Sequence, residues 1–328
     1  MTGWNANDIP DQHGRTAIVT GANSGIGYVT ARELARRGAR VVLACRDETR
    51  GRDAEERMRE EVPKARLRFA PLDLADLASV RAFAGWYDKV GFRAEGDGRC
   101  DSDADDQLDL LVNNAGVMAL PYGITADGFE RQFGVNHLGH FALTGLLLPK
   151  LLATPGSRVV SVSSGLHMLS NIDLGDLNSE GGYHRWIAYA RSKSANLLFV
   201  HELSRRLARA RADVLVAAAH PGYAATNLQT AGPRMEGRRR VERLVELGNR
   251  IVAQPAEAGA LPSLHAATAP GVAPDSFTGP RVQGLRGAPV RSWRAPWTRD
   301  DRAGELLWDA SEQLTGVRYE GLEPSFGG

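Results

Sequence analysis

Short apolar runs alternate with helix-type segments along most of this chain. The apolar runs are rich in Val, Ile, Leu and Ala, and they lie at residues 17–19, 41–44, 67–70, 110–112, 159–162 and 214–217. Helical patterns separate them, at residues 25–37, before residue 57, at 77–87, at 127–152 and around residue 189. Strands that are apolar throughout and are joined by helices indicate a parallel sheet covered on both faces. The pattern therefore predicts an α/β fold with a doubly wound parallel sheet in a single domain.

The same pattern predicts the limits of this domain. Residues 1–14 precede the first strand and form an N-terminal extension, residues 15–285 form the catalytic domain, and residues 286–328 form a C-terminal extension. Two stretches have the composition of surface loops. Residues 91–107 are a polar insertion, and residues 223–240, which end in a basic run, are expected to be a lid.

The C-terminal part has a weaker pattern. Residues 276–294 should contain the last strand of the sheet, although their glycines and arginines leave its pairing open. Trp293 and Trp297 are expected to pack the extension onto the domain, and a helix is expected over about residues 300–314.

Charge and cysteine content exclude several classes of protein. The chain has 40 Lys and Arg against 39 Asp and Glu, so no overall field favours nucleic acid. Its two cysteines form neither a disulfide framework nor a zinc pattern, which favours a reducing, cytoplasmic location. The most apolar long run, residues 141–152, is too short and too interrupted to span a membrane. The expected partner is therefore a small molecule, and a homo-oligomer is compatible with the sequence.

A glycine-rich turn follows the first strand. In the run Thr20-Gly-Ala-Asn-Ser-Gly-Ile-Gly27, glycines between a strand and a helix permit a tight turn and close approach of a pyrophosphate. The helix N-terminus then supplies free N–H groups and a favourable dipole. This predicts a Rossmann-type dinucleotide site, whose residues here are Gly21, Asn23, Ser24, Gly25, Ile26 and Gly27.

The end of the second strand favours NADP(H) over NAD(H). An NAD site usually carries a carboxylate there for the ribose 2′-hydroxyl, whereas this chain has Cys45 followed by Arg46. A guanidinium can bind the 2′-phosphate through paired hydrogen bonds. Asp47 follows, and we expect it to cap the next helix rather than to bind the ribose.

Tyr189 and Lys193 lie four residues apart, which places them on one face of a helix. A free tyrosine has a pKa near ~10. A neighbouring ammonium favours the phenolate and can lower that pKa by roughly 1–3. The pair could therefore exchange a proton with an alcohol or a carbonyl.

Taken together, these motifs resemble the short-chain dehydrogenase/reductase family. The resemblance is carried, in order, by the glycine turn, Asn113-Asn114-Ala115-Gly116, Ser164, Tyr189-x-x-x-Lys193 and Pro221-Gly222. The stretches 43–47 and 176–178, with the long gap from Ser164 to Tyr189, resemble its retinol-dehydrogenase-like branch. The resemblance implies an NADP-dependent oxidoreductase that interconverts a carbonyl and an alcohol.

The resemblance also implies roles for individual residues. It assigns catalysis to Asn136, Ser164, Tyr189 and Lys193, with Asn136 holding a water that relays protons. It also has Tyr189 and Lys193 contact the cofactor, with Lys193 binding the nicotinamide ribose. It places Asp73 and Leu74 at the adenine, and Asn114, Ala115 and Gly116 along the cofactor. It has Pro221, Gly222 and Thr226 close over the nicotinamide and pyrophosphate.

Aromatic and apolar side chains near these motifs favour an apolar, bulky carbonyl or alcohol as substrate. They are Met118, Leu120, Tyr122, Met168, Tyr183, Trp186 and the segment 223–228. Two other functions stay open, a double-bond reductase that uses NADP and a catalytically silent dinucleotide sensor.

Several histidines lie near the motifs and have alternative interpretations. His137 and His140 have a spacing that could suit a metal, but no carboxylate or cysteine matches it, so we expect none. His167 could line the substrate pocket or could have a surface or packing role. His220 is expected to pack at the end of the sixth strand.

Overall fold

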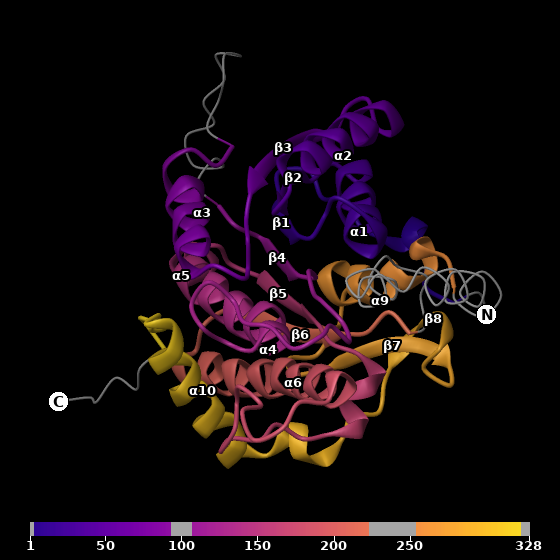
Figure 1. Cartoon of the computed structure of the whole chain (residues 1–328). Helices are drawn as coiled ribbons and strands as arrows, with labels where there is room; N and C mark the ends of the chain where they lie inside the picture. The colour runs from indigo at the N-terminus through magenta and orange to yellow at the C-terminus, as the bar shows by residue number, and fades with distance from the viewer. Residues whose placement is uncertain (1–2, 93–106, 223–253, 323–328) are drawn as a thin grey trace, which may run out of the picture.

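The computed structural model describes residues 3–92, 107–222 and 254–322 (Figure 1). The predicted insertion at 91–107 therefore lies almost entirely outside the described residues, as does the predicted lid at 223–240 together with Thr226.

One eight-stranded sheet forms the centre of the domain, in the order β3-β2-β1-β4-β5-β6-β7-β8. Its strands are β1 Thr16–Thr20, β2 Arg40–Cys45, β3 Arg66–Pro71, β4 Leu110–Asn113, β5 Ser157–Val162, β6 Val214–Ala219, β7 Phe277–Val282 and β8 Arg286–Arg291. All pairs are parallel except β7 with β8. The six strands predicted from the apolar runs, and their parallel arrangement, are confirmed.

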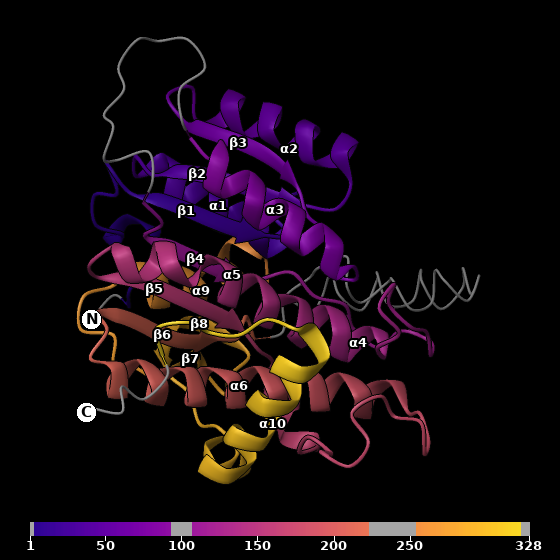
Figure 2. The ribbon, with the colours of Figure 1, turned by 90° about the vertical axis from the view of Figure 1, so that its left-hand side faces the viewer.

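Helices cover both faces of the sheet (Figure 1). The longer ones are α1 Gly25–Arg36, α2 Glu48–Glu61, α3 Leu77–Lys89, α5 Gly139–Ala153, α6 Arg185–Ala210, α9 Ala256–Thr268 and α10 Asp301–Thr315. Helices α1, α2 and α9 lie on one face, whereas α3, α5 and α6 lie on the other, with α10 outside α6 (Figure 2). The described helices include none with the length and apolar character needed to cross a bilayer.

The central strands are buried on both faces, which explains why their sequences do not alternate. Every residue of β1, β2 and β4 is buried. One hydrophobic cluster joins the sheet to α3, α5, α6 and α10, and a second joins it to α1, α2 and α9. Burial of apolar surface on both sides, worth about 25 cal/mol per Å², therefore holds the sheet between its helices.

The end of the sheet differs from the simplest prediction. Residues 276–294 form an antiparallel hairpin, β7 and β8, instead of one strand, because the chain reverses at Gln283 and Gly284, both with positive φ. Strand β8 thus belongs to the sheet although it lies beyond residue 285. The helix expected near residues 300–314 is confirmed as α10, which Asp300 caps by accepting the Ala303 N–H.

Candidate active site

Each glycine position in the turn after β1 requires glycine for steric reasons. Gly21 and Gly25 have φ of +67° and +56°, a region that side chains disfavour. A Cβ on Gly27 would lie 2.4 Å from the Gly21 carbonyl oxygen and 2.5 Å from Nδ2 of Asn114. The chain therefore leaves an open cradle at the start of α1, where Ser24 is the N-cap but its side chain does not cap the helix. These residues fit a dinucleotide pyrophosphate.

Thr20 connects this turn to the end of β4. Its hydroxyl oxygen accepts the N–H groups of Asn114 and Ala115, both at 2.9 Å, and its carbonyl accepts from Nδ2 of Asn114 at 2.8 Å. The two predicted cofactor segments are therefore held side by side. Thr20 belongs to the glycine motif in the sequence, but its role in holding Asn114 and Ala115 was not predicted. The signal available was a polar residue ending a buried strand.

The adjoining end of β2 carries the exposed guanidinium of Arg46. Cys45 is buried, and burial raises its pKa to about 12, whereas the Arg46 side chain is 73% exposed and its Nε lies 4.0 Å from Oδ2 of Asp73. Asp47 accepts the N–H of Arg50 at 3.0 Å and begins α2. The capping role predicted for Asp47 is confirmed, so Arg46 faces solvent beside the end of β3. This arrangement fits a 2′-phosphate.

Ser164, Tyr189 and Lys193 come together at the C-terminal edge of the sheet. Ser164 follows β5, and its side chain lies close enough to the Tyr189 hydroxyl to act on the pKa of that group. Tyr189 and Lys193 are 6% and 4% exposed on α6, one turn apart. The Lys193 Nζ donates to the Val162 carbonyl at 3.0 Å and lies 5.7 Å from the centre of the Tyr189 ring.

The electrostatics of this pair differ from the prediction. Burial raises the pKa of Tyr189 to about 12, and the nearby Ser164 side chain opposes that rise. Burial also lowers the pKa of Lys193 to about 8. The predicted lowering of the Tyr189 pKa is thus wrong for this arrangement, because desolvation dominates and the ammonium is directed at the Val162 carbonyl. Tyr189 is consequently protonated at neutral pH and can donate.

Asn136 lies in a π-helical turn, η3 Gly134–Leu138, between α4 Arg131–Phe133 and α5. Such widened turns occur often at functional sites. The Asn136 side chain accepts from Val117 N at 2.7 Å and donates to Oγ of Ser192 at 2.9 Å. A Cβ on Gly116 would lie 3.1 Å from Asn136 Oδ1 and 3.5 Å from Lys193 Nζ. The three residues therefore converge, and the link to Ser192 was not foreseen.

The last predicted cofactor segment also reaches this edge. Pro221 and Gly222 follow β6, Gly222 has a φ of +67°, and a Cβ there would lie 2.4 Å from the Leu285 carbonyl oxygen. The Pro221 carbonyl accepts from Nε2 of Gln254 at 2.5 Å. Leu74, predicted at the adenine, is 7% exposed after β3.

Aromatic side chains line a recess beside the start of α6. Its volume is about 470 Å³, and it is lined by Pro121, Tyr122, Tyr183, His184, Arg185 and Trp186. The Tyr122 and Tyr183 rings meet edge to face at 5.2 Å, and the Tyr183 hydroxyl donates to the Leu120 carbonyl at 2.7 Å. Trp186 precedes Tyr189 by three residues, which places both on the same side of α6. Met168, predicted to line the substrate site, is 51% exposed.

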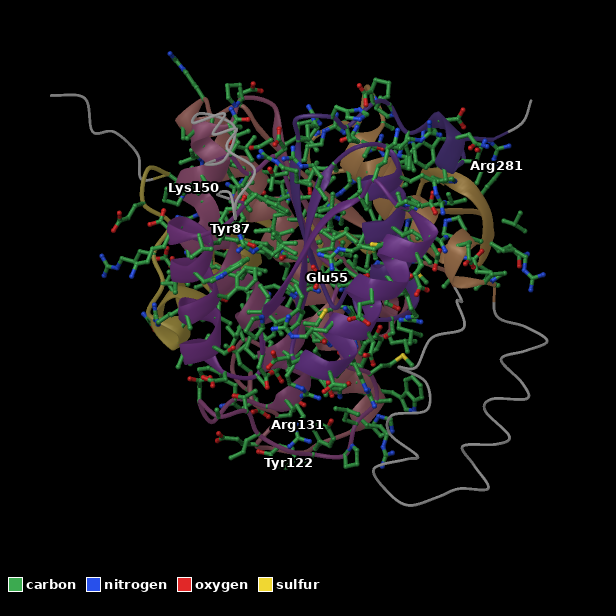
Figure 3. All side chains as sticks on the ribbon, turned by 90° about the horizontal axis from the view of Figure 1, so that it is seen from above. Glu55, Tyr87, Tyr122, Arg131, Lys150 and Arg281 are labelled. Carbon is green, nitrogen blue, oxygen red and sulfur yellow. The ribbon has the colours of Figure 1, made fainter. Side chains whose placement is uncertain are left out.

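Buried Gln132 holds the two walls of this recess together. Its Oε1 accepts the N–H of Ala119, a residue with a φ of +50°, and its Nε2 donates to the Tyr183 hydroxyl. Figure 3 shows Tyr122 and Arg131 together at one end of the molecule, away from Lys150 in the last turn of α5. The recess therefore lies at the end of the domain that carries the loops after β4.

The paired histidines serve internal hydrogen bonds. His137 Nε2 lies 2.9 Å from Oγ of Ser311, and His140 Nε2 lies 3.0 Å from the Thr20 hydroxyl. Burial lowers their pKa values to about 3 and about 4. Within the described ranges, no group of three or more His, Cys, Asp or Glu is placed to hold a metal ion.

The other two histidines also pack internally. His167 is 1% exposed and contacts backbone atoms on both of its ring nitrogens, which fits the packing alternative. His220, at the end of β6, packs its ring 4.9 Å from that of Phe277, and its predicted packing role is confirmed. Of the two tryptophans expected to hold the extension, Trp297 hydrogen-bonds Ser194 on α6 at 3.4 Å, whereas Trp293 is 63% exposed.

Comparison with known proteins gives consistent results. A family model described as short chain dehydrogenase matches residues 15–237. Retinol dehydrogenase 12 of Homo sapiens is 42% identical over 310 residues, which span 94% of this chain and 88% of that protein. An uncharacterised protein of Mycobacterium paratuberculosis has a TM-score of 0.76 at 43% identity, covering 97% of this chain and 99% of the other.

A structure from Beutenbergia cavernae with bound NADP is more distant, with a TM-score of 0.57 at 27% identity over 79% of this chain and 91% of that one. These similarities show that the protein is an oxidoreductase acting on CH–OH or C=O groups. They also agree with the resemblance to the retinol-dehydrogenase-like branch.

Proposed function

The chain belongs to the short-chain dehydrogenase family, and from this premise we propose that it interconverts a carbonyl and an alcohol on an apolar small molecule. The proposed cofactor is NADP(H), and Tyr189 is the general acid and base. One observation carries this proposal: the buried Tyr189 side chain lies within reach of the Ser164 side chain, and Lys193 lies one helical turn farther along α6 with its Nζ 5.7 Å from the centre of the Tyr189 ring.

Each residue of the site has a separate role in the reduction. The bound nicotinamide supplies the hydride, so the protein must manage the charge and the proton on the substrate oxygen. Ser164 and Tyr189 donate hydrogen bonds to that oxygen, where negative charge develops. Tyr189 then gives up its proton, and the Lys193 ammonium stabilises the phenolate. Asn136 fixes the backbone at Val117, and its proposed role in the reaction is to hold the water that returns protons.

The surroundings of the site support an apolar substrate. The recess before Tyr189 is aromatic on both sides, with Tyr122 and Trp186 51% and 42% exposed. Exposed aromatic rings at the entrance of a pocket favour a ligand with a large apolar surface. The relative named for retinol, an apolar alcohol, supports the same class.

Product analysis tests the function and separates its alternatives. We would incubate the protein with NADPH and panels of apolar aldehydes, ketones and enones, and identify the products by mass spectrometry. Alcohols formed from the carbonyls support the proposal, whereas saturated ketones formed from the enones identify a double-bond reductase. Binding of NADPH without turnover on any compound would identify a silent sensor.

Arg46→Ala should change the cofactor preference. Losing a charged hydrogen bond costs about 1.5–3 kcal/mol, so NADPH affinity should fall by about 10-fold to 100-fold, while NADH affinity changes little. Calorimetric titration measures both. Arg52→Ala is the matched control, because Arg52 is exposed on α2 but is paired with Glu48 at 2.8 Å. Equal affinity of the unmodified protein for the two cofactors would contradict the assignment.

The pH profile of the reduction should report Lys193. Because burial lowers the pKa of Lys193 to about 8, the ammonium is present below about pH 8 and is lost above it. Tyr189, with a pKa of about 12, stays protonated throughout. Turnover at saturating NADPH should therefore fall as the pH rises through about 8. Turnover that stays constant or rises up to pH 9.5 would be inconsistent with a required ammonium.

A further inference from the structure

Four consecutive residues after β8, which we call the strap (residues 292–295), are linked to three of the segments that carry the proposed site: the loop of Ser164, the turn at Gly222, and α6. The strap begins where Ser292 N donates to the Phe277 carbonyl at 2.7 Å, beside the first residue of β7. Strand β7 starts level with the end of β6, because Phe277 and Thr278 pair with Ala218 and Ala219. The strap therefore lies at the edge of the sheet where the reaction is proposed to occur.

The first contact reaches the loop of Ser164 through His167. The His167 Nδ1 lies 2.7 Å from the Ser164 carbonyl oxygen, so this nitrogen carries the proton and donates. The other nitrogen, Nε2, then accepts the N–H of Ala295 at 3.1 Å. Buried His167 thus links the backbone of the strap directly to the backbone of the proposed catalytic serine.

The second contact reaches the cofactor turn through His220. Gly222 N donates to Nδ1 of His220 at 3.3 Å, which leaves Nε2–H to donate to the Ser292 hydroxyl at 2.9 Å. The imidazole packs directly against the backbone of Gly279, where a Cβ would lie 1.9 Å from its Nε2. The strap therefore accepts a hydrogen bond from the imidazole that in turn accepts the Gly222 N–H.

The third contact reaches α6 through Arg294, whose side chain is 1% exposed. Its guanidinium donates to the Leu197 carbonyl at 3.2 Å and to the Asp275 carboxylate at 2.6 Å, and Nε donates to the Thr298 hydroxyl at 3.1 Å. Leu197 is one turn beyond Lys193 on the same helix. A buried guanidinium that loses a partner is strongly unfavourable, so Arg294 fixes the strap against the helix of Tyr189.

From these contacts we propose that the strap positions the catalytic serine and the cofactor turn relative to α6. His167 and His220 are its positioning residues: His167 sets the backbone of Ser164, and His220 sets the turn at Pro221 and Gly222. Neither histidine exchanges a proton with the substrate. The inference rests on the proposed function and adds to it a requirement for a segment outside the motifs.

The two contacts predict different kinetic effects. His167→Leu removes both hydrogen bonds of the imidazole, so Ser164 shifts and kcat should fall by about tenfold or more, while the NADPH dissociation constant stays within about twofold. Ser292→Ala releases His220, so the NADPH dissociation constant should rise by about threefold to tenfold, the effect of one hydrogen bond, with a smaller change in kcat. Ser292→Thr keeps the hydroxyl and should restore cofactor affinity.

Ser311→Ala is the matched control. Ser311, on α10, also hydrogen-bonds a buried histidine, since its Oγ lies 2.9 Å from Nε2 of His137. The substitution should lower the melting temperature without changing kcat or the NADPH dissociation constant. If His167→Leu does not fold, His167→Asn can keep an amide donor near the Ser164 carbonyl while losing the acceptor for Ala295, and it should show the same fall in kcat.

Two results would overturn the proposal. In the first, the His167 and Ser292 variants resemble Ser311→Ala, with lower stability and unchanged kinetics. In the second, each of these variants alters kcat and cofactor affinity by the same factor. NADPH affinity is measured without substrate. An unmodified protein that binds NADPH but reduces no carbonyl would thus refute the proposed function only. The affinities of Ser292→Ala, Ser292→Thr and Ser311→Ala would still decide whether the strap positions the cofactor turn.

Discussion

Tyr189→Phe should lower turnover by at least roughly 10²-fold, the scale of lost general acid catalysis, and should leave NADPH affinity nearly unchanged. The substitution keeps the buried ring and removes only the hydroxyl that Ser164 contacts. Because burial raises the pKa of Tyr189 to about 12, the hydroxyl is a proton donor across the neutral range, as carbonyl reduction requires. Single-turnover reduction with NADPH measures the chemical step.

A second buried tyrosine provides the control for this effect. Tyr319 is 3% exposed, and its hydroxyl donates to the Phe141 carbonyl at 2.7 Å, on the side of the domain covered by α10. Tyr319→Phe should cost about 1 kcal/mol of stability and leave turnover as it is. Near-normal turnover of Tyr189→Phe on a carbonyl substrate would mean that another group supplies the proton.

Lys193→Met should impair both turnover and cofactor binding, since the ammonium is proposed to serve both. Turnover should fall by at least roughly 10²-fold, and NADPH affinity by about 10-fold to 100-fold, as expected for loss of a charged hydrogen bond. Fluorescence titration of NADPH and steady-state kinetics measure the two effects. Lys64→Met, at an exposed position after α2, is the control and should change neither.

The melting temperature of Lys193→Met distinguishes a loss of catalysis from misfolding. Burial lowers the folded-state pKa of Lys193 from 10.5 to about 8, so at pH 7 the protonated side chain opposes folding. Replacing it with an apolar side chain of similar length should therefore maintain or raise the melting temperature. Loss of turnover together with a large fall in melting temperature would show that Lys193 has a structural role. Unchanged NADPH affinity in Lys193→Met would show that Lys193 does not bind the cofactor.

Sequence periodicity was sufficient for the fold of the nucleotide-binding part. The strands at residues 17–19 and 41–44 could be recognised because strands covered on both faces must be apolar throughout. The glycine turn was equally clear, since Gly21 and Gly27 occupy positions where the backbone conformation or the neighbouring atoms exclude a side chain. These signals are local, so a single sequence contains them.

The hairpin β7–β8 could not be predicted, because glycines and prolines interrupt the strand pattern of both of its strands. Pro280 and Gly287 belong to these strands although neither favours a strand. What places β8 is its pairing with β7 at the open edge of the sheet. The strap follows from this, since residues 292–295 reach the active-site edge only because β8 returns along β7.

The sequence by itself determined the fold class, the glycine cradle and the pair Tyr189 and Lys193, because each depends on local pattern or on residue type at a fixed spacing, and its resemblance to a known family added Ser164. Only the tertiary structure decided the electrostatics of the site. Spacing alone indicated that Lys193 would lower the pKa of Tyr189, but the pKa is raised because both side chains are buried and Nζ is directed at the Val162 carbonyl. Desolvation and the direction of a charge depend on all the surrounding elements, and no spacing along one helix contains that information.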